Sequence, residues 1–199
     1  MKRIAVFAVF VLLFSVLIAA AQGPPPKPTP APELKKLDYF VGTWKTEGEL
    51  KPGSMGPGSP GGKFTELGHN SWMAGHFFLA EHTNAKSDVM GNLEEIAYLG
   101  YNTEEKVYTY DAFNSMGEAE HAKGTVEGDT WTWTSTEKMG GQTMKGRFTI
   151  TVASPTSYTF KFEIAPENSS NYTTIVEGKS TKVVAAAKGK GAEGGAGKK

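Results

Sequence analysis

One stretch decides the fold of this chain: residues 130–165, which read TWTWTSTEKMGGQTMKGRFTITVASPTSYTFKFEIA. Aromatic and branched apolar residues alternate in it with threonine and charged residues through three successive runs. The runs are separated by Gly140-Gly141 and by Pro155, which are turn signals. Alternation with a period of two is typical of a β-strand with one buried and one solvated face. The stretch therefore predicts two consecutive β-hairpins.

The lengths of the two turns predict how these three strands are paired. A two-residue turn at Gly140-Gly141 and a three-residue turn centred on Pro155 place the apolar residues of all three strands opposite one another. The expected rows are Trp133–Phe148–Phe162 and Trp131–Ile150–Phe160. A slip by one residue would bring Lys161 into this apolar layer, so we expect the register to be strongly enforced.

Similar segments fill most of the remaining chain. Short runs rich in Thr, Tyr, Phe, Trp and Val are separated by turn residues, which predicts about ten strands joined by hairpins. We expect strands at residues 43–50, 63–73, 77–84, 94–101, 107–114, 119–127, 130–138, 143–152, 157–165 and 172–183. Before them, Glu33–Phe40 predicts one or two helical turns with Leu34, Leu37 and Phe40 on one side.

The predicted fold is all-β: an antiparallel up-and-down barrel of about ten strands with a short N-terminal helical lead-in. An open meander of this size leaves two unpaired edges, and closure into a barrel removes them. A two-sheet sandwich is the alternative. The length of 199 residues suits one domain, and 39% hydrophobic residues suffice for a core.

The two ends of the chain differ in composition from its middle. Lys2-Arg3, a following apolar run and Ala19-Ala20-Ala21 are the parts of a secretory signal peptide, with an uncleaved membrane anchor as the alternative. We expect a signal peptide at residues 1–21, a Pro-rich linker at 22–33, the barrel domain at 34–184 and a disordered Gly/Lys tail at 185–199. The protein is then secreted or periplasmic, with no stable membrane insertion after cleavage.

Composition and motifs exclude several classes of function. The chain has no cysteine, which rules out disulfides, thiolate metal sites and a thiol nucleophile. Its 21 basic and 21 acidic residues give no excess positive charge, so no nucleic-acid partner is expected. No nucleophile elbow, His-Glu-x-x-His or phosphate loop is present, and we identify no catalytic residues. The sequence favours a protein that is not an enzyme.

The first predicted strand carries a resemblance to a known family. Gly42-Thr43-Trp44, inside LDYFVGTWKTEGEL, resembles the Gly-x-Trp opening of lipocalin-like (calycin) barrels. Together with residues 70–79, 99–111 and 127–148, it is similar to the bacterial family called domain of unknown function 1579. The resemblance implies an exported barrel in which Gly42 and Trp44 are structural, and it transfers no activity. Nitrobindin-type haem barrels open similarly, but their Tyr-Pro step has no counterpart in residues 46–51.

The aromatic layer is the candidate ligand site. Barrels of eight or more strands can enclose one small ligand, so we expect a small apolar molecule as the partner. The candidate residues are Trp131, Trp133, Phe148, Ile150, Tyr158, Phe160 and Phe162. The alternative is a structural or protein-interaction barrel with a filled core. The sequence does not predict the oligomeric state.

Two histidines supply the second alternative, a metal- or haem-binding barrel, although we expect no cofactor. A two-residue turn at Ala74-Gly75 would place His69 diagonal to His82 on one face of the sheet, about 7–8 Å apart. Two half-exposed histidines without a ligand are the simpler interpretation. Asp111, Glu118, Glu120 and His121 lie near the Asn114–Gly117 turn and could act in acid–base chemistry, but no partner nucleophile stands at a recognisable spacing, so we assign them to a solvated turn.

The first prediction concerns export. Because signal peptidase cuts after an Ala-x-Ala end, the mature protein should begin at Gln22 or within one or two residues of it. N-terminal sequencing of protein from the native cell checks this. Intact Met1 in the membrane fraction would instead identify an uncleaved anchor.

Overall fold

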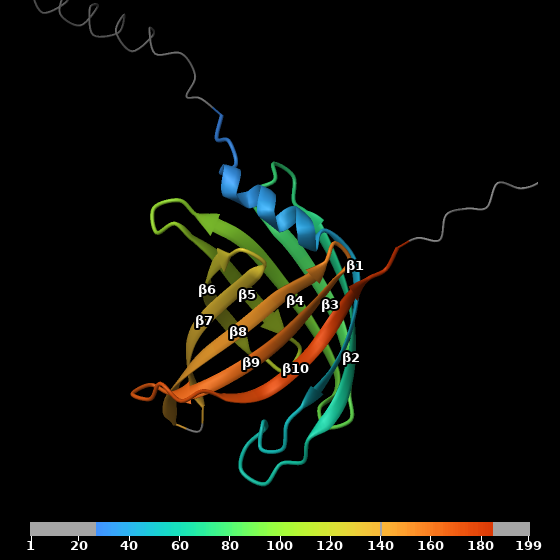
Figure 1. Ribbon diagram of the computed structural model, residues 1–199, viewed down its shortest axis with the longest axis vertical. Coiled ribbons are helices and arrows are strands. Elements are labelled where there is room, and N and C mark those ends of the chain that lie inside the picture. The colour runs from blue at the N-terminus through green and yellow to red at the C-terminus, as the bar shows by residue number, and fades with distance from the viewer. Residues whose placement is uncertain (1–26, 140, 185–199) are drawn as a thin grey trace, which may run out of the picture.

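A computed structural model describes residues 27–139 and 141–184 and shows a closed antiparallel barrel with a short helix at one end (Figure 1). The elements are η1 (Pro32–Phe40), β1 (Gly42–Leu50), β2 (Gly62–Trp72), β3 (Leu79–Ser87), β4 (Gly91–Asn102), β5 (Val107–Asn114), β6 (Ala119–Glu127), β7 (Thr130–Met139), β8 (Gln142–Ser154), β9 (Ser157–Pro166) and β10 (Thr173–Lys182). The predicted signal peptide, the tail and the first part of the predicted linker lie outside the described residues. The helix begins at Pro32, inside the segment expected as linker.

Each strand pairs with its neighbours in the sequence, and β1 also pairs with β10, which closes the sheet. The predicted up-and-down barrel is therefore confirmed, and the sandwich alternative is wrong. The predicted rows Trp133–Phe148–Phe162 and Trp131–Ile150–Phe160 are also observed. The turn between β8 and β9 differs from the prediction: Ser154 pairs with Ser157, and an irregularity between Val152 and Ser154 restores the expected register.

Glycines at the closure allow aromatic rings to cover the backbone. Gly48 of β1 pairs with Gly178 of β10, and the rings of Phe64 and Phe160 lie over them from the flanking strands. A Cβ atom on either glycine would come within 2.6 Å of one of these rings. The two rings approach each other with centroids 6.4 Å apart. Closure and core packing therefore depend on each other at this row.

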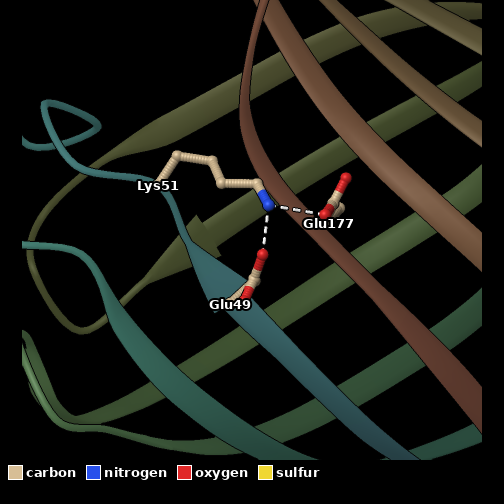
Figure 2. Close-up of polar contacts among 3 residues, drawn as sticks. All are labelled: Glu49, Lys51 and Glu177. Atoms are coloured by element: carbon tan, nitrogen blue, oxygen red, sulfur yellow. Dashed lines mark hydrogen bonds and ion pairs between the residues drawn. The ribbon is translucent and has the colours of Figure 1, made fainter.

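A cluster of charges joins the same two strands on the outside. Figure 2 shows Lys51, just after β1, reaching both Glu49 of β1 and Glu177 of β10. The backbone N–H of Lys51 also donates to the carbonyl of Ile175, at 2.9 Å. The charged groups are partly exposed, so the ion pairs contribute little to stability compared with the backbone ladder.

The helix η1 is a 3₁₀ helix that closes one end of the barrel (Figure 1). Its buried residues Leu34, Leu37 and Phe40 recur every third position, and side chains three apart lie above one another in a 3₁₀ helix. Leu37 is fully buried. The expected helical lead-in and its apolar side are thus confirmed.

Hydrogen bonds fasten this helix to the strands beneath it. Trp44 Nε1 donates to the Phe40 carbonyl at 2.8 Å, and Tyr108 Oη donates to the Glu33 carbonyl at 2.9 Å. Gly42, at the start of β1, has φ +120°, a conformation that favours glycine. Gly42 and Trp44 therefore set the angle at which the chain turns from the helix into the barrel wall.

The connection between β2 and β3 is longer than predicted. Phe77 and Phe78, expected in a strand, lie before β3 begins, and the Met73 N–H donates to the Phe78 carbonyl at 2.9 Å. The longer turn moves the predicted pairing by two residues, so His69 lies directly opposite His82.

Within residues 27–139 and 141–184, no helix has the length and apolar character needed to span a bilayer.

The second prediction tests the register of β9. Phe160→Ala should lower the free energy of unfolding by about 3–5 kcal/mol, because a buried ring is lost and a cavity is left behind. Thr159→Ala, on the exposed face of the same strand, should change it by less than about 0.5 kcal/mol. Urea unfolding followed by tryptophan fluorescence measures both. Equal effects would contradict the observed register.

Candidate functional site

A cavity of about 290 Å³ lies inside the barrel. Its lining comes from η1 and from each of the strands β1 to β10, so it is a property of the closed fold rather than of one loop. Phe40 of η1 forms part of the lining at the end that the helix covers. The interior is therefore not filled, and two walls of different chemistry face the space.

The aromatic wall comes mainly from β7, β8 and β9. The residues of the predicted set that line the cavity are Trp133, Phe148, Ile150, Tyr158, Phe160 and Phe162. Trp131 lies deeper, in contact with Phe40 at a ring-centroid distance of 5.2 Å and stacked on Trp133 at 5.4 Å. Trp131 thus belongs to the layer between the cavity and the helix.

The acidic wall comes from β2 to β6, and sequence reasoning missed it. Four glutamates of these strands line the cavity: Glu66, Glu81, Glu95 and Glu120. Glu120 was assigned to a solvated turn, which is wrong. Glu81 and Glu120 lie in one cross-strand row and are separated by Ala97 and Ala112, whose short side chains leave space between them.

Enclosure raises the pKa of these carboxyl groups. Burial, with added repulsion from Glu66 and Glu95, raises the pKa of Glu81 to about 8. Burial is also the main cause that raises the pKa of Glu66 and of Glu120 to about 7. The pKa of Glu95 is raised by burial, partly offset by a hydrogen bond from Tyr110. Their side chains still have accessible surface, because they face the cavity, but the barrel wall surrounds them.

The hydrogen-bond partners of these carboxyl groups are neutral. Tyr110 Oη donates to Glu95 at 2.8 Å, and the hydroxyls of Thr46 and Thr83 lie 3.4 Å from Glu66 and Glu81. The cavity lining in the described part of the chain includes no lysine, arginine or histidine. The acidic wall is therefore not neutralised by the protein's own cations.

One polar recess in this wall holds an acceptor without a partner. Asn70 is 8% exposed and lies opposite Glu81, yet its side-chain oxygen Oδ1 has no hydrogen-bond partner. The oxygens of Thr83, Asn70 and Glu81 lie 3.5, 3.6 and 3.6 Å from the position that a Cβ atom would take on Gly68. Gly68 thus leaves a gap about the size of a Cβ atom, and these three oxygens border it.

The paired histidines lie on the outer surface. His69 and His82 are both exposed, and His69 Nδ1 is 3.0 Å from the Thr43 hydroxyl. Across residues 27–139 and 141–184, no group of three His, Asp or Glu side chains is arranged to hold a metal ion. The pair is closer than predicted, but it does not face the cavity.

The acidic wall is hard to predict from hydrophobicity, because large apolar residues lie on the outside of the same strands. Leu67, Ile96 and Phe113 are 42%, 41% and 52% exposed, while their neighbours in the sequence point inward. The pairing register of the strands is the feature of the sequence that could have revealed the acidic wall. Extending the pairing from Trp133 to Gly124 and onward places Glu120 and Glu95 on the inner face.

The chain belongs to the family described as protein of unknown function (DUF1579), whose family model matches residues 29–182. The resemblance inferred from the sequence is therefore confirmed. No curated protein matches the chain.

Two solved structures share the barrel. Rv2717c from M. tuberculosis is 13% identical with a TM-score of 0.52, and the match covers 78% of this chain and 99% of that one. The S-type phycobiliprotein lyase CPES from Guillardia theta is 10% identical with a TM-score of 0.51, covering 76% and 93%. At these identities the likeness shows the fold alone.

The third prediction concerns pH. The raised pKa values mean that the folded state holds more protons than the unfolded state between about pH 4.5 and 8, so stability should fall as pH rises through this window. A tenfold difference in proton affinity between the two states corresponds to about 1.4 kcal/mol. The urea midpoint should be lower at pH 8.5 than at pH 5.5.

Glu81→Gln should reduce the difference in urea midpoint between pH 5.5 and pH 8.5, because an amide stays neutral at both pH values. Glu94→Gln, on the exposed face of β4, should leave it unchanged. A wild-type protein that gains stability from pH 5.5 to pH 8.5 would contradict the raised pKa values.

Proposed function

We propose that this protein binds a small molecule inside its barrel. The observation that carries the proposal is the cavity of about 290 Å³, lined by an aromatic wall and by polar groups that converge on it. Small-molecule sites typically combine apolar walls with a few fixed polar groups in about 300–1,000 Å³. A purely structural barrel has no need of such a space, because an empty interior loses packing energy.

The aromatic wall supports binding of a ligand with an apolar body. Phe148 and Phe160 lie with ring centroids 5.6 Å apart, and Phe148 and Phe162 lie 6.5 Å apart. Their positions are fixed by backbone pairing across β8 and β9, so the wall is formed before a ligand arrives. A site formed in advance avoids part of the entropic cost of ordering side chains on binding.

The ends of the barrel suggest the direction of access. The helix η1 covers the end at which β1 begins, and the loop 51–61 lies at the opposite end (Figure 1). We infer that a ligand reaches the cavity from the end with this loop. One structural neighbour is named a phycobiliprotein lyase. Its name agrees with a small-molecule role for such barrels, but it does not identify a ligand for this chain.

We also propose that binding takes place in the periplasm or outside the cell. The support is the basic start, apolar run and Ala-x-Ala end of residues 1–21. Stability without disulfides is compatible with this location, because the barrel closes through its backbone ladder.

The fourth prediction tests the cavity with the neutral dye N-phenyl-1-naphthylamine, whose fluorescence rises in apolar surroundings. The wild type should bind it in a saturable way, and quenching or energy transfer from Trp133 should report its position. Val176→Phe, which fills part of the cavity, should weaken binding at least tenfold. Lys179→Phe, on the outer face of the same strand, should leave it within twofold.

Unchanged binding in Val176→Phe would place the dye elsewhere on the molecule. The absence of saturable binding by the wild type would contradict the proposed function. Circular dichroism of both variants confirms that they retain the barrel.

A further inference from the structure

We propose that the ligand is an organic cation, with its ammonium group among Glu66, Glu81 and Glu95 and its apolar body against the aromatic wall. This inference rests on the proposed function and specifies the chemical class that the cavity accepts. It follows from the arrangement of the acidic wall, from the acceptors around Gly68 and from the size of the cavity.

The acidic wall places three carboxyl groups on neighbouring strands around one residue, Thr83. Thr83 pairs with Gly68 on one side and with Glu95 on the other, and Glu81 pairs with Asn70. Glu66 lies on β2 two residues before Gly68, on the same inner face. The three carboxyl groups thus surround Thr83 from three neighbouring strands.

The groups that face this position are acidic or neutral on every neighbouring element. Besides the three carboxyls, they are Thr46 of β1, Tyr110 of β5, Glu120 of β6, Tyr158 of β9 and Ser180 of β10. Glu118 adds repulsion near Glu95 and Glu120, Glu137 adds repulsion near Glu120, and the neighbouring His121 partly offsets this at Glu120. Buried carboxylates without a counter-ion are costly, so a cationic ligand has a large electrostatic advantage over a neutral one.

The recess above Gly68 gives an independent reason for an ammonium group. The unpartnered Oδ1 of Asn70, the Thr83 hydroxyl and a Glu81 oxygen border it. Carboxylates and amide oxygens are acceptors, and an ammonium group supplies up to three N–H donors and no acceptor. One ammonium can therefore satisfy several of these oxygens at once, through strong charge-assisted hydrogen bonds.

A metal ion is a poorer fit than an organic cation. Among residues 27–139 and 141–184 the carboxyls do not gather around one point as metal ligands do. The opposite wall is aromatic, and aromatic faces attract organic cations as well as apolar groups. A volume of about 290 Å³ suits a molecule with one ring and a short aminoalkyl chain.

The test compares three ligands that share a phenylethyl body and differ in their polar group: phenethylamine, 2-phenylethanol and 3-phenylpropionate. Isothermal titration calorimetry with the purified protein at pH 8.5 gives the three dissociation constants. We expect phenethylamine to bind at least tenfold more tightly than 2-phenylethanol, and 3-phenylpropionate to bind most weakly. Lowering the pH to 5.5 should weaken the binding of phenethylamine at least tenfold, because protonated carboxyls lose their attraction for the cation. The dissociation constant of 2-phenylethanol should change by less than twofold.

Matched variants locate the interaction. Glu81→Gln and Glu66→Gln should each weaken the binding of phenethylamine at least fivefold. Neither variant should weaken the binding of 2-phenylethanol or of the naphthylamine dye. Glu94→Gln removes the same charge from the outer face of β4 and should change none of the three. The amide variants are close in shape to the wild type and remove a buried charge, so they are expected to fold.

The outcomes separate this inference from the proposed function. Equal affinities for phenethylamine and 2-phenylethanol, or a preference for 3-phenylpropionate, would overturn the cationic ligand while the binding cavity stands. If Glu94→Gln lost as much affinity for phenethylamine as Glu81→Gln and Glu66→Gln, the cationic ligand would also be overturned, because the attraction would then be a general surface effect. If neither the dye nor any of the three ligands binds, both the inference and the proposed function are wrong.

Discussion

The pairing of β1 with β10 is the constraint on which the rest of this structure depends. It joins the two ends of the strand series, so no strand in the described barrel is left with an open edge. It also brings Gly48 and Gly178 side by side, and the rings of Phe64 and Phe160 pack over the backbone there. The absence of side chains at this row lets large rings lie along the wall instead of projecting to the centre. The same row therefore closes the barrel and leaves room inside it.

The interior is divided because the two halves of the barrel bury different kinds of residue. The half formed by β7, β8 and β9 holds bulky aromatic side chains in register. The half formed by β2 to β6 combines glutamates with short residues such as Gly68, Ala97 and Ala112. Neither half alone produces a cavity, because aromatic side chains on all sides would fill the space. The cavity results from placing large residues opposite small and acidic ones.

The sequence was sufficient for the barrel because its strongest signals were local. Alternation in residues 130–165 and the two short turns predicted three strands and their register. The β2–β3 turn was predicted less well, because Ala74-Gly75 does not specify a turn length, and the error moved His69 by two positions relative to His82. The acidic wall could not be read from hydrophobicity, because Leu67 and Phe113 face solvent while Glu66 and Glu95 face inward. Its orientation is imposed by strands distant in the sequence, which decide the face that each residue presents.

The buried carboxyl groups change the charge that the outer surface presents. By composition the chain is neutral, with 21 basic and 21 acidic residues. At pH 6, however, Glu66, Glu81 and Glu120 are mostly protonated, which leaves 18 acidic residues against 21 basic ones. The folded molecule thus carries about three fewer negative charges than its composition implies, and its isoelectric point lies above that of the unfolded chain. In mildly acidic surroundings the native protein therefore migrates as a more basic protein than its amino-acid composition implies.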